Sequence, residues 1–155
     1  MPASLPDAVV IGAGLIGCGV AYELAKRGAN VTVYDRSEPA RAASWAGAGM
    51  LAPYSEELAD RDLLALCAAS LRAFPAFVDE LRERTGVDAR LRVEGTLHVA
   101  FDDPTEAALG ERCETFRRNG ADAALLGRGA ALAREPLLCG DVRGAMLVAN
   151  EAHVD

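Results

Sequence analysis

The start of the chain changes from a continuous apolar run to a helical period. Residues 8–11 read Ala-Val-Val-Ile, which is typical of a fully buried strand. Ile16, Val20 and Leu24 then recur every four residues and predict a helix whose apolar stripe faces a core. Residues 31–34 are β-branched and aromatic and predict a second strand. Strand, helix and strand in this order predict a βαβ unit, the start of an α/β fold.

The pattern changes after residue 54. Apolar residues at steps of three and four predict a helix over 55–84, which Pro75 would divide into two pieces. Residues 91–93 and 96–101 alternate between apolar and polar positions and predict an antiparallel hairpin with its turn at Glu94-Gly95.

The remaining segments predict a mixture of helix and strand. Asp103 is the expected N-cap of a helix that runs to about Arg118. Shorter segments follow at 123–126 (strand), 129–134 (helix) and 145–149 (strand). We therefore predict two parts, residues 1–54 and residues 55–155, the second an inserted α+β portion with an antiparallel sheet.

A glycine pattern lies where the first strand meets the first helix. Gly12, Gly14 and Gly17 form Gly-x-Gly-x-x-Gly, in which the glycines allow a tight turn, close approach of a pyrophosphate and close packing of helix on strand. Asp35 ends the second strand, where a carboxylate can accept hydrogen bonds from both ribose hydroxyls. The alternative is a glycine turn in an ordinary βαβ unit. The combination favours a Rossmann-like dinucleotide site.

Residues 40–50 are almost all small. Residues 44–50 read Ser-Trp-Ala-Gly-Ala-Gly-Met, so successive backbone N–H groups are available with little side-chain bulk. Such a main chain can lie against a phosphate or a flat ring. A flexible linker is the alternative, but Trp45 and Met50 are large apolar residues for which a linker has little use.

Composition narrows the function classes. The 155 residues carry a net charge of −7, which argues against nucleic acid or an anionic membrane surface as the main partner. No apolar run is long enough to span a bilayer and no signal peptide is evident, so we expect a cytoplasmic protein. Four widely spaced cysteines and two histidines favour free thiols and no metal site.

Three segments together resemble a known family. The glycine turn at 9–17, the Ala-Gly-Met-Leu-Ala-Pro element at 48–53 and the segment from Gly144 to Asp155 are similar to the FAD-dependent amine and D-amino-acid oxidases, and most of all to the glycine oxidases of thiamine biosynthesis. The resemblance covers essentially the whole chain but only the first part of the family's length. It therefore implies a Rossmann-like FAD-binding start that is incomplete relative to the family.

The resemblance also implies which residues hold the cofactor. The pyrophosphate would be held by the glycine turn, the ribose by the acidic end of the second strand, and the diphosphate and flavin by the small-residue loop. By similarity these are Gly12, Gly14, Leu15, Ile16 and Gly17; Asp35 and Arg36; and Ala43, Ser44, Ala48, Gly49 and Met50. The family's substrate residues lie later than residue 155, so no catalytic residue is assigned.

The implied activity is oxidation of glycine or another small amine, with oxygen as the second substrate and hydrogen peroxide as a product. The resemblance allows a homo-oligomer. Two alternatives stay open at this point. One is an NAD-dependent dehydrogenase, for which Asp35 would serve equally well. The other is a truncated, non-catalytic dinucleotide-binding fragment, and on its own this chain is expected to be inactive.

Overall fold

The computed structural model describes residues 5–155. The chain forms two compact units, Met1–Ala48 and Gly49–Asp155. Residues 49–54, which the change of pattern groups with the first part, lie in the second unit. The division at residue 54 stays a prediction, and each unit is described separately below.

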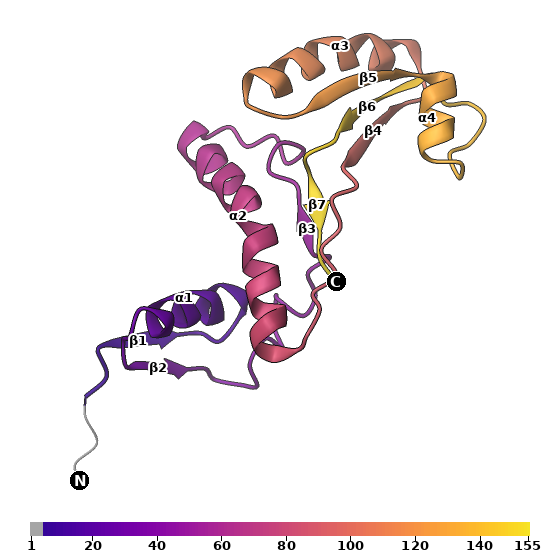
Figure 1. The fold of residues 1–155 in the computed structure, drawn as a ribbon. Coiled ribbons are helices and arrows are strands. Elements are labelled where there is room, and N and C mark those ends of the chain that lie inside the picture. Colours follow the sequence, from indigo (N-terminus) through magenta and orange to yellow (C-terminus); the bar gives the residue numbers. More distant parts are fainter. Residues whose placement is uncertain (1–4) are drawn as a thin grey trace. The chain divides into compact units, whose positions relative to one another are not determined.

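The first unit is the predicted βαβ unit. Strand β1 (Ala8–Ile11) leads into helix α1 (Leu15–Lys26), and the chain returns as strand β2 (Val31–Tyr34). The two strands are parallel and pair in register from Ala8 with Val31 to Ile11 with Tyr34. The three elements and their order confirm the pattern-based prediction, as Figure 1 shows in indigo and purple.

The apolar faces of this unit are exposed, contrary to the prediction. Val9 is 52% and Ile11 80% exposed, and the expected core-facing stripe of α1 includes Ile16 at 83% and Val20 at 49%. No residue of α1 is buried. The prediction of a fully buried strand assumed the neighbouring strands and opposite layer of a doubly wound sheet. Among the described residues this sheet has two strands.

The second unit is built on an antiparallel sheet. Strands β4 (Thr96–Ala100), β6 (Gly144–Val148) and β5 (Ala123–Gly127) lie in the order β4-β6-β5. Helix α3 (Asp103–Arg118) packs along the sheet, and the short helix α4 (Arg128–Arg134) lies at one end (Figure 1). A separate two-stranded ladder pairs β3 (Met50–Leu51) with β7 (Ala152–His153), and helix α2 (Arg61–Thr85) completes the unit. This α+β unit agrees with the predicted fold class.

Residues of β6, α3 and α2 form a hydrophobic core in the second unit. Met146 and Val148 of β6 are fully buried against the α3 residues Leu109, Cys113 and Phe116. Leu64 and Ala68 of α2 join the same cluster. The sheet, α3 and α2 therefore share one hydrophobic core.

The predicted hairpin is wrong. Strand β4 pairs with β6 and not with residues 91–93, of which only Arg92 forms an isolated bridge, to His153. Gly95 has φ +81°, and its N–H donates to the carbonyl of Glu151. The chain at residues 94–95 thus passes from one ladder to another and does not fold back on itself.

The predicted break at Pro75 is also wrong. Helix α2 continues from Arg61 to Thr85, with Pro75 inside it. Asp60 caps the start by accepting from the N–H groups of Asp62 and Leu63, and Gly86 ends the helix with φ +73°. Proline removes only one helical hydrogen bond, and the helix buries residues on both sides of it, so packing holds the two turns together.

The N-cap of α3 lies one residue earlier than predicted. Asp102, not Asp103, has extended backbone and accepts from the N–H of Thr105. Two neighbouring aspartates both match the cap pattern, and the backbone conformation decides between them.

Candidate functional site

The glycine turn has little room for side chains at its centre. Gly12 has φ +102°, and its N–H donates to the carbonyl of Tyr34 at 2.7 Å, which joins the turn to β2. A Cβ placed on Gly17 would lie 1.8 Å from the carbonyl oxygen of Gly12. Gly17 is therefore required for helix α1 to start so close to β1, as the motif predicts.

Ser44 lies at the start of α1 although it is 29 residues from Leu15 in sequence. Its Oγ accepts from the N–H of Leu15 at 2.9 Å. A Cβ on Gly14 would lie 3.1 Å from the same oxygen. Gly14 is the N-cap of α1 and offers no side-chain cap. Two separate predicted segments, the glycine turn and the small-residue loop, thus meet at one helix N-terminus, which is where an anion is favoured.

The carboxylate of Asp35 stabilises the glycine turn by a hydrogen bond. Its Oδ2 accepts from the N–H of Ala13 at 2.7 Å, and its Oδ1 accepts from the N–H and the hydroxyl of Ser37. The hydrogen bond from Ala13 is the largest cause that holds the pKa of Asp35 below its ordinary value, with the bond from the Ser37 N–H second. Asp35 therefore has a structural role that the sequence pattern did not predict, beside the ribose contact that it did.

The other predicted residues of this unit lie on its surface. Arg36 and Ala43 are exposed, as are Ile16 in the first turn of α1 and Ala48 at the end of the unit. The carbonyl of Ala43 accepts from the N–H of Ala46 in a turn. Their roles toward a cofactor stay predictions.

Gly49 and Met50 belong to the second unit and are held by its last residues. Gly49 has φ +71°, and a Cβ on it would lie 1.9 Å from the carbonyl oxygen of Val154. The carbonyl of Gly49 accepts from the N–H of Val154 at 2.9 Å, and Met50 pairs with His153. Met50 and its neighbours line a hollow of about 300 Å³. Cys67, Leu71 and Phe74 of α2 also line this hollow.

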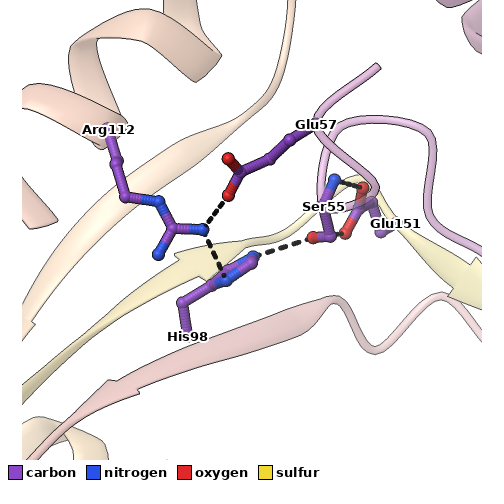
Figure 2. A network of polar contacts seen from close by, with 5 residues as sticks. All are labelled: Ser55, Glu57, His98, Arg112 and Glu151. Carbon is purple, nitrogen blue, oxygen red and sulfur yellow. Dashed lines mark hydrogen bonds and ion pairs between the residues drawn. The ribbon is translucent and has the colours of Figure 1, made fainter. Parts of the chain in front are cut away.

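A chain of polar side chains lies beside this segment (Figure 2). Glu151 is completely buried, and its Oε1 accepts from the N–H groups of Tyr54 and Ser55 at 2.9 and 2.8 Å. Its Oε2 accepts from the hydroxyl of Ser55 at 2.5 Å. The Ser55 Oγ also lies 2.8 Å from Nε2 of His98, whose Nδ1 faces Arg112 at 3.3 Å.

The hydrogen-bond partners of His98 fix its tautomer. Arg112 can only donate, so Nδ1 accepts, and Nε2–H donates to Ser55, whose own hydrogen goes to Glu151. Burial lowers the pKa of His98, and the charge of Arg112 adds to this. His98 is therefore neutral in this arrangement. No sequence motif indicated it, because Ser55, Arg112 and, through Ser55, Glu151 come from three distant segments.

Comparison with known proteins identifies the family. The FAD dependent oxidoreductase family matches residues 7–155. This chain belongs to that family. The glycine oxidase of Geobacillus kaustophilus is 34% identical over 149 residues, which are 96% of this chain and 40% of the relative. The bifunctional protein ThiO/ThiG of Trichormus variabilis is 45% identical over 82 residues, 53% of this chain and 12% of that protein.

Solved structures agree. The crystal structure of the Geobacillus kaustophilus glycine oxidase superposes with a TM-score of 0.88 over 96% of this chain and 40% of the other. The iminodiacetate oxidase of Chelativorans sp. BNC1 gives a TM-score of 0.80 at 30% identity over 96% of this chain and 40% of the other. The chain thus spans about two fifths of the length of these relatives.

FAD is the cofactor of this family, which decides between the flavin and nicotinamide alternatives. The residues present fit it: Gly14 and Gly17 place no side chain at the turn, and the N-cap Gly14 leaves the main-chain N–H groups of the helix start without a side-chain cap of its own. No group of three His, Cys, Asp or Glu residues among residues 5–155 could hold a metal ion. Within the same residues, no helix is both long enough and apolar enough to cross a membrane.

Proposed function

We propose that this chain is the FAD-binding start and the first part of the substrate region of a cytoplasmic flavoprotein that oxidises glycine or another small amino acid or amine. The observation that carries the proposal is the match to a glycine oxidase along 96% of the chain with a TM-score of 0.88. When bound, FAD supplies the two-electron chemistry: glycine, oxygen and water give glyoxylate, ammonia and hydrogen peroxide.

The glycine turn and Ser44 are the proposed diphosphate site. The N–H groups of the first turn of α1 have no intrahelical acceptor, and the positive end of the helix favours an anion. Gly12, Gly14 and Gly17 keep side chains out of this space, and Leu15, Ile16, Ala43 and Ala48 supply backbone around it. Ser44 satisfies the Leu15 N–H, which leaves the following N–H groups for phosphate oxygens.

Asp35 is the proposed ribose acceptor, with Arg36 beside it. A carboxylate has about four acceptor sites, and three hydrogen bonds from Ala13 and Ser37 leave one on Oδ2. The lowered pKa of Asp35 favours the ionised form, in which both oxygens only accept. Asp35 can thus hold a ribose hydroxyl while it still braces the turn.

Gly49 and Met50 are the proposed flavin contacts. The tight packing of Gly49 on Val154 fixes the main chain, and the hollow behind Met50 lets its side chain lie between a ring and α2. Apolar groups there would also exclude water from the reacting atoms. The similarity to a protein named ThiO/ThiG supports a place in thiamine thiazole synthesis.

The test is glycine-dependent release of hydrogen peroxide by the full-length protein. We expect the visible absorption of oxidised flavin in the purified protein, and turnover of glycine, sarcosine or a D-amino acid when each is offered in turn. A Gly17→Ala variant should lose flavin, whereas Gly19→Ala, which adds a methyl where nothing lies within 4 Å, should retain it. A flavin-free wild-type protein would contradict the proposal.

The alternative of a non-catalytic fragment has its own observation in favour, the exposed apolar faces of the first unit. We expect the 155-residue chain alone to bind FAD weakly and to release no peroxide from glycine. Peroxide release by this chain alone would contradict that expectation. Gel filtration of the full-length protein tests whether it forms a homo-oligomer.

A further inference from the structure

Residues 49–55 lie alongside residues 151–154. The first three residues of this segment pair through the backbone, whereas the last two bind a side chain. Gly49 pairs with Val154, Met50 with His153 and Leu51 with Ala152 through the backbone. Pro53 has no N–H and cannot continue a ladder. At the next two residues the acceptor is a side chain instead: Glu151 binds the N–H groups of Tyr54 and Ser55.

The geometry of Glu151 suits a fixed anchor. A buried carboxylate is tolerated when donors surround it, and Glu151 accepts three hydrogen bonds, all from residues 54 and 55. Its own carbonyl accepts from the N–H of Gly95. The side chain and the backbone of Glu151 therefore connect the segment after Met50 to the start of β4.

Ser55 links this anchor to the sheet and to α3. Its hydroxyl donates to Glu151 and accepts from His98 of β4, and His98 accepts from Arg112 of α3. Arg112 also forms an ion pair with Glu57. In this row Arg112 donates to His98, His98 to Ser55 and Ser55 to Glu151.

We propose that Glu151 is a positioning residue that fixes residues 49–55 and thereby sets the place of Met50 at the flavin. This inference rests on the proposed function, because it assumes that Met50 faces the cofactor. It differs from a general role in stability in that the side-chain hydrogen bonds of Glu151 all come from Tyr54 and Ser55, four and five residues after Met50.

Three substitutions in the full-length protein separate the parts of the anchor. Glu151→Ala removes all three acceptor contacts. Glu151→Gln can keep its oxygen on the two N–H groups but turns a donor toward Ser55, and Ser55→Ala keeps those two contacts without the hydroxyl. We expect Glu151→Ala to raise the dissociation constant for FAD about tenfold and to shift the visible flavin band. Glu151→Gln and Ser55→Ala should fall between this variant and wild type.

Leu109→Ala is the matched control. Leu109 is buried in the same core but lies on α3, and its side chain has no donor or acceptor that could bind residues 49–55. This variant should lower the melting temperature as Glu151→Ala does, yet leave the flavin band and FAD affinity of the folded protein unchanged. An equal flavin effect in Leu109→Ala, or none in Glu151→Ala, would overturn the inference.

Hydrogen exchange of the flavin-free protein tests the anchor independently of FAD. The amides of Tyr54 and Ser55 should be protected in wild type and exchange quickly in Glu151→Ala, whereas unchanged protection would refute the anchor itself. Wild-type protein that takes up no flavin would instead refute the proposed function, and the flavin half of this inference with it.

Discussion

The two units differ in how much of their apolar surface is buried. In the second unit, Met146, Val148 and Cys113 have no exposed surface. In the first unit, Ile11 and Ile16 are more than three quarters exposed, although the backbone of the βαβ unit is regular. Local structure therefore forms from short-range signals alone, but a stable core needs the neighbouring layers.

Gly17 and Gly49 also differ between the two units in what their close packing brings together. Gly17 in the first unit and Gly49 in the second are both packed against a backbone carbonyl, so each permits one close approach. Gly17 brings a helix N-terminus to a strand, where we propose that the cofactor phosphates bind. Gly49 brings two strands together, which closes the unit itself. Four predictions test how far this difference extends.

The largest effect is expected at Gly49. Gly49→Ala combines a left-handed φ of +71° with a Cβ 1.9 Å from the Val154 carbonyl oxygen, and should lower the free energy of unfolding by about 2–4 kcal/mol. Gly86→Ala is the control, because Gly86 has nearly the same φ, +73°, and open space around it. That variant should cost only about 1–2 kcal/mol in thermal or denaturant unfolding. Equal losses would show that close packing at Gly49 contributes nothing.

Gly17→Ala comes next. The methyl group would clash with the Gly12 carbonyl, and overpacking of this kind costs about 1–3 kcal/mol. Gly19→Ala in the same helix has open space and should stabilise α1 by about 0.5–1 kcal/mol. Hydrogen exchange of the amides of residues 8–34 measures both. Protection that is equal in the two variants would mean that the turn tolerates a side chain at Gly17.

A smaller, pH-dependent effect is expected at His98. Because burial lowers its pKa below the ordinary 6.5, the unfolded chain takes up a proton that the folded chain resists. The stability that His98 contributes is therefore complete above pH 6.5 and is lost as the pH falls toward its folded pKa. Melting temperatures from pH 8 to 5 should show this decline in wild type and in His153→Gln, and a shallower one in His98→Gln. Parallel curves for all three proteins would refute it.

The smallest effect is expected in acid, at Asp35 and Asp102. Hydrogen bonds from the Ala13 N–H and from Thr105, respectively, hold their pKa values below the ordinary 3.8. A carboxyl group whose pKa is lowered on folding stabilises the folded state above pH 3.8. This contribution is lost as the pH falls through the folded pKa. Asp35→Asn should weaken protection in the first unit and Asp102→Asn in the second, with both differences disappearing in strong acid. A difference that persists there would point to packing instead of charge.

The sequence by itself determined the local elements and the candidate site of the first unit. The glycine spacing, the acid at position 35 and the change of hydrophobic period depend on residues close together in the chain, and the βαβ unit follows them. Ser44 could also be chosen as a site residue, because its small-residue loop is unusual, although its contact with Leu15 could not be foreseen.

Only the tertiary structure decided the strand partners and the buried polar chain. Residues 91–93 and 96–101 fit a hairpin by pattern, but β6, more than forty residues later, offers β4 a longer pairing surface with a buried face. Pro75 stays within one helix because its neighbours are packed. Glu151, His98 and Ser55 belong to no sequence motif, and only folding buries Glu151, partly buries the other two and makes each the partner of the next.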